Sequence, residues 1–232
     1  MIFSLFYREN SKYRALTFEH KMQINIDSIR DAGKELFGNI IRTPTIRSQY
    51  LSGAINADVF LKLENLQYTS SFKVRGAYVS IKRLREKQKQ MGVIAMSAGN
   101  HAQAVAWWAQ KERVKATIVM PEQAPLSKVM KTKNLGAEVI LKGRTLNESQ
   151  TYVSELVHNR KLTLIHPYDD PNVVIGQGTL GLELMDDIKN LELLVIPIGG
   201  GGLISGISII AKSLNPNIKI FGVQTEKFPS MY

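Results

Sequence analysis

One lysine stands among small and polar residues, directly before a segment with the pattern of a helix. The stretch covers residues 70–77 and reads SSFKVRGA, with the lysine at position 73. A lysine whose surroundings keep part of it neutral can form a Schiff base with an aldehyde or ketone. Because thirty of the 232 residues are Lys or Arg, Lys73 becomes a candidate for this chemistry only with support from other segments.

Four consecutive glycines, Gly199, Gly200, Gly201 and Gly202, follow a strongly apolar segment and precede a segment with helical spacing. A glycine loop between a strand and a helix presents backbone N–H groups and the positive end of the helix dipole. Glycine costs roughly 0.5–1 kcal/mol relative to alanine in a regular element, so four in a row indicate close backbone approach by a ligand. The loop predicts a phosphate site, although it matches neither nucleotide-binding glycine motif. A tight loop under packed helices is the structural alternative.

A third polar turn, SAGNH at residues 97–101, also lies between a predicted strand and a predicted helix. The free N–H groups and short polar side chains at such a helix start can bind a carboxylate. The structural alternative is that Ser97 or Asn100 only caps the helix, which is the commonest use of these residues. Together, the three turns can form a pyridoxal phosphate (PLP) site, with an amine for the aldehyde, a polar group for the ring hydroxyl and a glycine loop for the phosphate.

Strand-like and helix-like segments alternate along the chain, which predicts an α/β fold with parallel sheets flanked by helices. Asp27 is expected to cap the first helix, and Gly136 to follow the end of the fourth. Residues 92–166 are expected to form a small domain between two parts of a larger one, 22–91 and 167–232. The predicted helices are 27–37, 74–88, 101–111, 126–135, 147–160, 174–188 and 203–214, and the predicted strands are 58–63, 92–96, 116–120, 137–142, 162–165, 191–197 and 218–224.

Composition narrows the class of protein. The net charge of +10 is spread over several predicted helices, which is typical of solvated faces and disfavours a nucleic-acid partner. The absence of cysteine excludes disulfides and thiolate metal sites and fits a reducing cytoplasm. No apolar run reaches the ~18 residues of a membrane span, so no membrane partner is expected. Residues 1–21 lack a signal-peptide cleavage pattern and are expected to be a poorly ordered leader.

Three segments, in this order, resemble the threonine dehydratase (threonine ammonia-lyase) and serine racemase family of PLP-dependent enzymes. They are SFKVRGA at 71–77, SAGNHAQ at 97–103 and GGGGLISG at 199–206, with support from RTPT at 42–45, HPYDDP at 166–171 and GQGT at 176–179. The resemblance runs from about residue 24 to residue 226. It implies the fold of the tryptophan synthase β-like PLP enzymes with an incomplete large domain, two open parallel sheets flanked by helices, and a homo-oligomer.

The resemblance also implies roles for individual residues. Lys73 would hold PLP covalently and later move the proton at the substrate Cα. Ser70 stands where glycine is frequent in the family, and the family's Ser or Thr partner of the pyridine nitrogen corresponds to positions beyond Tyr232. The remaining roles are a ring neighbour (Phe72), a partner of the ring hydroxyl (Asn100), a phosphate loop (Gly199, Gly200, Gly201, Gly202) and a site for the substrate carboxylate (Ser97, Asn100, His101).

Two further positions discriminate within the family. Serine racemases that resemble this chain carry a serine where this chain has Ala98, so dehydration of L-threonine or L-serine to a 2-oxo acid and ammonia is favoured over racemisation. Metal-activated relatives carry an acidic residue near Gln224, so we expect no metal there. A truncated, inactive remnant of such an enzyme and a racemase-like enzyme remain the alternative hypotheses.

Overall fold

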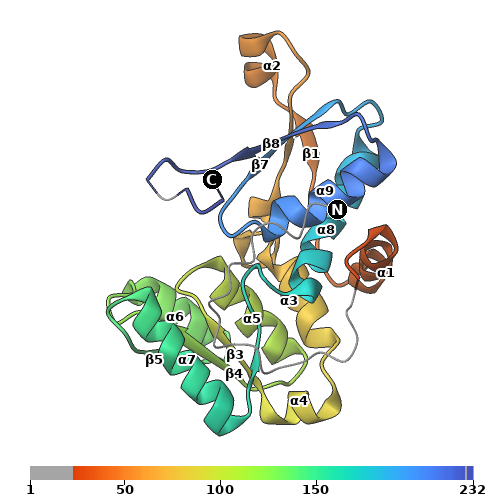
Figure 1. Cartoon of the computed structure of the whole chain (residues 1–232). Helices are drawn as coiled ribbons and strands as arrows, with labels where there is room; N and C mark the ends of the chain where they lie inside the picture. The colour runs from red at the N-terminus through yellow and green to blue at the C-terminus, as the bar shows by residue number, and fades with distance from the viewer. Residues whose placement is uncertain (1–22, 228, 232) are drawn as a thin grey trace.

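The computed structural model of the chain describes residues 23–227 and 229–231, so the expected leader lies outside the described residues. Helices and strands alternate along most of the chain (Figure 1). The helices are α1 (Ile26–Leu36), α2 (Gln49–Ile55), α3 (Lys73–Lys82), α4 (Glu86–Met91), α5 (Asn100–Lys111), α6 (Leu126–Asn134), α7 (Leu146–Arg160), α8 (Pro171–Asp187) and α9 (Gly202–Leu214), with the 3₁₀ turns η1 (Glu64–Leu66) and η2 (Tyr68–Ser70). The strands are β1 (Thr45–Arg47), β2 (Phe60–Lys62), β3 (Val93–Met96), β4 (Ala116–Met120), β5 (Glu138–Leu141), β6 (Thr163–Leu164), β7 (Leu193–Pro197) and β8 (Lys219–Val223).

A parallel sheet with the order β5-β4-β3-β6 occupies the lower half of Figure 1. Successive side chains of its strands point to opposite faces. Ala95 and Ile118 belong to the core that also contains side chains of α3, α5 and α6. Ile94 and Val119 instead pack with Val153 and other residues of α7. Helices thus cover both faces of this sheet, as expected for a parallel sheet with fully buried strands.

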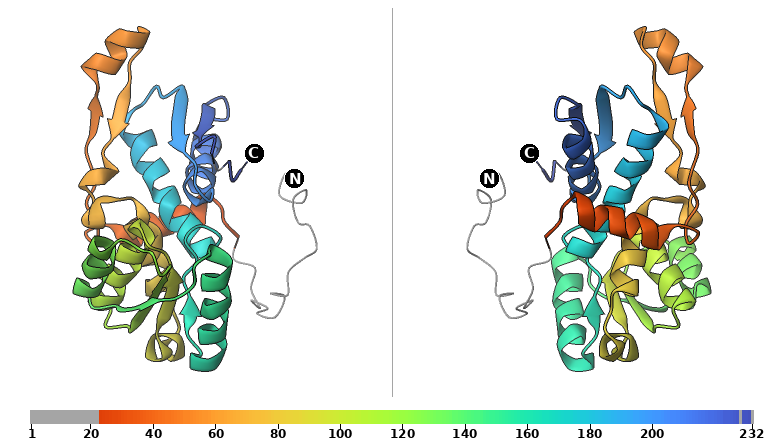
Figure 2. Two further views of the ribbon diagram at one scale, coloured as in Figure 1. Left: turned by 90° about the vertical axis from the view of Figure 1, so that its left-hand side faces the viewer. Right: turned by 90° about the vertical axis from the view of Figure 1, so that its right-hand side faces the viewer.

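The second parallel pair joins β7 to β8, and α9 packs against one side of it. Leu194 and Ile196 point into this contact, whereas Val195 is 65% exposed on the opposite side. The fold class predicted from the sequence, α/β with parallel sheets flanked by helices, is therefore confirmed. The predicted strand 58–63 contains β2, but β1 and the antiparallel pairing of the two strands were not predicted. With α2 this pair extends as an arm away from the rest of the chain (Figure 2).

Helix α8 lies between α3 and α9 and brings their first turns into one region. A Cβ added at Gly176 would lie 2.5 Å from the backbone oxygen of Arg75, so the backbones of α8 and α3 touch there. Gly178 of α8 and Gly206 of α9 form a second close crossing, because a Cβ at Gly206 would overlap the backbone of α8. Lys73 begins α3 and Gly202 begins α9. The close contacts at Gly176, Gly178 and Gly206 therefore place both candidate site segments against the same helix, α8.

Three predicted helix boundaries were wrong. Asn25, not Asp27, caps α1, because Asn25 and Ser28 exchange side-chain and backbone hydrogen bonds of 2.9 and 3.0 Å. The predicted helix 74–88 is divided into α3 and α4, since Arg85 is extended and its N–H donates to the Gln88 side chain at 2.9 Å. Helix α8 begins earlier than predicted, at Pro171, because proline is compatible with the first helical position.

The described residues also bear on three other predictions: the end of α6, the membrane and the domain division. Gly136 has φ +80° and its N–H donates to the carbonyl of Lys133 at 2.8 Å, which confirms it as the C′ glycine that follows Leu135, the C-cap of α6. Among the helices of residues 23–227, none combines the length and apolar character needed to cross a bilayer. The strands β3 to β6 all fall between residues 92 and 166, but the division into a small and a large domain stays a prediction.

Candidate functional site

Lys73 is the first residue of α3 and its side chain is largely buried. Its Nζ donates a hydrogen bond of 2.6 Å to the carbonyl oxygen of Pro167. Burial lowers the pKa of Lys73 from its ordinary value to about 8, because removal from water disfavours the charged form. A much larger fraction of this amine is therefore neutral near pH 7–8 than for an exposed lysine, as a Schiff-base nucleophile requires.

The first turn of α3 is tied to α5, the helix that follows the SAGNH turn. Trp108 of α5 donates its indole N–H to the carbonyl of Val74 at 2.9 Å. Lys73 is also close enough to His101 and His166 for its positive charge to lower the pKa of both rings. The fold thus brings two of the three predicted turns together, around the amine of Lys73.

The loop before Lys73 contains two residues in the left-handed region, Thr69 with φ +58° and Ser70 with φ +55°. Non-glycine residues in this region cost of order 1–3 kcal/mol and persist where surrounding contacts hold them. The side chain of buried Gln67 supplies such contacts: its Nε2 donates to the carbonyl of Ile41 at 2.7 Å, and its Oε1 accepts the N–H of Ile41 at 3.0 Å. The ring of Tyr68 also stacks on Trp107 with centroids 5.3 Å apart.

Phe72, the predicted ring neighbour, lies directly beside the amine. The Nζ of Lys73 is 5.4 Å from the centroid of the Phe72 ring. The same ring is partly buried against the apolar cluster formed by α8, α9 and the β7–β8 sheet. Phe72 therefore contacts both the lysine and the elements that carry the glycine loop.

In the SAGNH turn, two of the predicted ligands have different surroundings. Ser97 Oγ accepts the N–H of Gly99 at 3.1 Å and so shapes the turn. Asn100 is exposed at the first position of α5, where helix N–H groups lack intrahelical acceptors. An anion at this helix start would meet both the Asn100 amide and free backbone N–H groups.

His101 is buried, and its ring is not arranged to donate to a carboxylate. Nε2 lies 2.9 Å from the carbonyl oxygen of Ile165, which requires the ring proton to be on Nε2. Burial lowers the pKa of His101 to about 3, so the ring is neutral and Nδ1 carries no proton. In this arrangement the His101 ring has no free N–H for a carboxylate, whereas the His101 backbone N–H lies in the first turn of α5. His101 as a ligand of the substrate carboxylate stays a prediction.

The four glycines of the loop are required for different reasons. Gly201 has φ +86° and precedes α9, a conformation that favours glycine. A Cβ at Gly200 would overlap the ring atom Cδ1 of Tyr168, and one at Gly202 would lie 3.0 Å from the Tyr168 backbone oxygen. Gly199 differs, since a Cβ there would meet no described atom within 4 Å. Backbone conformation thus explains Gly201 and packing explains Gly200 and Gly202, while the open side of the loop lies at Gly199.

Residues 166–168 connect the lysine to the glycine loop. The carbonyl of Pro167 accepts from Lys73, and the next residue, Tyr168, covers Gly200. His166 Nδ1 accepts the N–H of Asp169 at 2.9 Å, and the His166 ring meets Tyr168 edge-on with centroids 4.7 Å apart. The sequence indicated only that residues 166–171 support the family resemblance; the place of Tyr168 on the glycine loop depends on tertiary contacts and has no local signal.

A buried ion network fixes α3 to α8 and η1, and sequence reasoning missed it. Arg75 is 0% exposed and forms paired hydrogen bonds with two carboxylates. Two bonds of 2.8 Å reach Glu64, and bonds of 2.6 and 3.0 Å reach Glu183. Lys62 Nζ adds a contact of 2.8 Å to Glu183. The one available signal was a charged residue inside the apolar run that follows Lys73.

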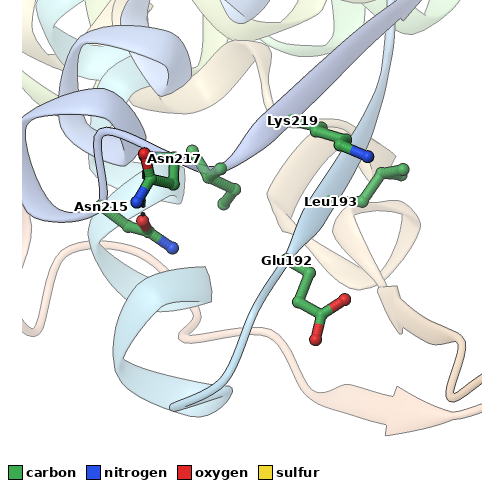
Figure 3. Close-up of a pocket in the computed structure, with 6 residues that line it drawn as sticks. Glu192, Leu193, Asn215, Asn217 and Lys219 are labelled. Carbon is green, nitrogen blue, oxygen red and sulfur yellow. Dashed lines mark hydrogen bonds between the residues drawn. The ribbon is translucent and has the colours of Figure 1, made fainter.

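A cavity of ≈ 290 Å³ lies elsewhere, at the start of β7 and β8 (Figure 3). The glycine loop follows the carboxyl end of β7, so the cavity and the loop are at opposite ends of this strand. Since none of the predicted site residues lines it, it is not the candidate site. Its lining residues are Glu192, Leu193, Asn215, Asn217, Ile218 and Lys219.

The residues around Lys73 fit a phosphorylated aromatic aldehyde. The amine has a lowered pKa, an aromatic ring lies beside it, and the glycine loop begins a helix and has one open side. A model of the pyridoxal-phosphate dependent enzymes matches residues 36–232. The chain belongs to this family. The family resemblance and the cofactor, both predicted from the sequence, are therefore confirmed.

Relatives within the family are similar over most of this chain. An L-threonine ammonia-lyase of Thermotoga maritima is 49% identical over 208 residues, which are 90% of this chain and 52% of that protein. The catabolic L-threonine dehydratase TdcB of Staphylococcus aureus is 51% identical over 209 residues, 90% of this chain and 60% of its own length. The chain thus spans between about half and three fifths of these curated relatives.

Solved structures show the same fold. The serine racemase of Dictyostelium discoideum superposes with a TM-score of 0.84 at 38% identity, covering 88% of this chain and 66% of that one. The processed form of threonine deaminase isoform 2 from Solanum lycopersicum superposes with a TM-score of 0.82 at 37% identity, covering 89% and 58%.

Proposed function

We propose that this chain carries the catalytic lysine and phosphate loop of an L-threonine ammonia-lyase, which converts L-threonine to 2-oxobutanoate and ammonia and accepts L-serine, giving pyruvate. The observation that carries the proposal is the amine of Lys73, partly desolvated and tied through Pro167 to the segment that covers the glycine loop. The names of the similar proteins from Thermotoga maritima and Staphylococcus aureus support this substrate.

Each candidate site residue has its own role in binding or proton transfer. PLP, when bound, supplies the electron sink for the charge that develops at the substrate Cα. Lys73 would hold the cofactor through its amine, and the same amine would take the proton from the substrate Cα. The N–H groups at the start of α9 bind the phosphate dianion. Phe72 packs beside the ring, Asn100 binds the ring hydroxyl, and Ser97 with the first turn of α5 orients the substrate carboxylate.

Ala98 favours elimination over racemisation. Racemisation needs a group that exchanges a proton on the face of Cα opposite to Lys73, and a methyl side chain has no proton to exchange. Ala98 is partly buried and packs against the core. We therefore rank racemase activity below ammonia-lyase activity.

A remnant that keeps a binding surface without catalysis is the second candidate. Its support is the apolar side of the β7–β8 sheet, where Val195, Phe221 and Val223 are 65%, 54% and 54% exposed. An exposed apolar face of this kind marks either a surface for further polypeptide or an aggregation hazard. Formation of 2-oxobutanoate from L-threonine separates the enzyme from the remnant.

The cofactor assignment is tested with Lys73→Ala. Adding PLP to the purified chain should produce visible absorbance that the Lys73→Ala variant lacks. Lys82→Ala is the matched control, since Lys82 ends the same helix and its side chain is 48% exposed. Equal absorbance in the wild type and in Lys73→Ala would refute the assignment. Absorbance without formation of 2-oxobutanoate would favour the remnant.

The proposal also covers assembly and location. The chain without cysteine suits a reducing compartment, and we place the protein in the cytoplasm. We also propose that the whole enzyme is a homo-oligomer, as the family resemblance implies. Sedimentation of the intact protein tests the assembly, and an exclusively monomeric species at micromolar concentration would contradict it.

A further inference from the structure

The contact between Tyr168 and the glycine loop joins residues from two separate segments of the chain. The site for a side chain at Gly200 is filled by the Tyr168 ring, and Gly202 packs against the Tyr168 backbone. Only two of the four glycines, Gly199 and Gly201, are therefore free of this contact. Because the Tyr168 ring lies directly against Gly200, the backbone of the loop cannot move toward the ring without overlapping its atoms.

The Tyr168 ring is also packed against a second aromatic ring, that of His166. His166 meets it edge-on, with centroids 4.7 Å apart and planes at 86°, an arrangement that aromatic pairs prefer. The Nδ1 of His166 accepts the N–H of Asp169 at 2.9 Å, which closes the turn that presents Tyr168. The carbonyl of the intervening Pro167 accepts the 2.6 Å hydrogen bond from Lys73. One short segment thus contacts both groups that the cofactor would bind.

We propose that Tyr168 is a positioning residue for the phosphate loop: its ring, lying on Gly200, holds the loop so that the N–H groups before α9 face the open side at Gly199. The inference rests on the proposed function, since it assigns the loop to the cofactor phosphate. It concerns the ring and not the hydroxyl, because the contact is made by the ring atoms Cγ, Cδ1 and Cε1.

The inference separates two glycines that the sequence presents as equivalent. A methyl group at Gly200 collides with Tyr168, whereas one at Gly199 meets no atom of the described residues within 4 Å. Gly200→Ala should therefore displace the loop in the apo-protein, and removal of the ring should relieve the collision. Gly199→Ala should leave the apo-protein intact and obstruct only the ligand.

The test is a double-mutant cycle of Gly200→Ala and Tyr168→Ala in the whole chain, with Gly199→Ala and Tyr168→Phe beside it. The two readouts are the urea unfolding midpoint of the apo-protein and the Kd for PLP. Gly200→Ala should lower the midpoint and weaken PLP binding about tenfold, equivalent to ~1.4 kcal/mol. In the Tyr168→Ala background the same substitution should have a much smaller effect on both. Tyr168→Phe should bind PLP as the wild type does.

The outcomes are distinct. Effects of Gly200→Ala and Tyr168→Ala that simply add in the unfolding midpoint would overturn the inference, as would loss of PLP binding in Tyr168→Phe. Gly199→Ala should keep the wild-type midpoint and weaken PLP binding; a lowered midpoint would show that its side is not open and would also count against the inference. A wild-type chain that binds no PLP would defeat the proposed function, and the unfolding cycle would still decide the Tyr168–Gly200 contact.

Discussion

Lys73 and Pro167 are 94 positions apart in the sequence, yet the lysine ammonium group donates a hydrogen bond of 2.6 Å to the Pro167 carbonyl. The bond anchors an amine that burial has made less basic. It also joins the start of α3 to the turn before α8. The chemistry of the site therefore depends on how these two segments meet.

The reactivity of Lys73 toward PLP should depend on pH with a midpoint near its lowered pKa of about 8. Burial disfavours the ammonium form, so the neutral amine that attacks the aldehyde increases as pH rises through 8. The initial rate of visible absorbance change after mixing with PLP should rise between pH 7 and pH 9 and then level off. A rate that keeps rising to pH 10 would show an amine with an ordinary lysine pKa, and Lys82→Ala should follow the wild-type curve.

Arg75→Met should cost about 3–5 kcal/mol of unfolding free energy, because it leaves Glu64 and Glu183 buried without their partner. Arg75→Lys should cost less, since it keeps the charge but loses the paired geometry. The matched control is Arg47→Met, whose partner Asp58 is 70% exposed and which should cost at most ~1 kcal/mol. Urea unfolding of the three variants measures these differences, and equal losses for Arg75→Met and Arg47→Met would contradict the network's role.

The parts of the fold that depend on local pattern were predictable. Strand β4 matches its predicted bounds of 116–120 because an apolar run there is bounded by turn residues. The start of α1 was less certain, because Asn25 and Asp27 are both good caps and only the reciprocal bond with Ser28 decides between them. The division between α3 and α4 contains neither glycine nor proline, so no local breaker marks it.

Local sequence pattern also predicts the candidate site only in part. Its chemistry-bearing residues are visible because lysine, glycine and asparagine stand in unusual local settings. Tyr168 and the Arg75 network are not visible, because their partners come from segments that only the folded chain brings together. His101 shows a further limit, because the sequence does not reveal that its ring is buried and that its Nε2 lies 2.9 Å from the carbonyl oxygen of Ile165.

Ser70→Gly should increase stability by up to about 1 kcal/mol, because Ser70 has φ +55° and glycine adopts that region without strain. The gain is limited because glycine also enlarges the conformational freedom of the unfolded chain. Ser213→Gly provides the control, since Ser213 is an exposed residue of the helix α9 and glycine there should reduce stability. If both substitutions destabilise equally in urea unfolding, the left-handed backbone at Ser70 carries no strain.

Ala98→Ser should introduce a measurable racemase activity, because a hydroxyl at position 98 can exchange a proton on the face of Cα that Lys73 does not reach. Formation of D-serine from L-serine, measured by chiral chromatography, should rise above the wild-type level while 2-oxo acid formation continues. Ala102→Ser is the control, since Ala102 lies four residues further on, in the first turn of α5, and is fully buried in the core. Unchanged D-serine formation in Ala98→Ser would mean that residue 98 does not face the reacting carbon, and the ranking of ammonia-lyase above racemase would lose its argument from this residue.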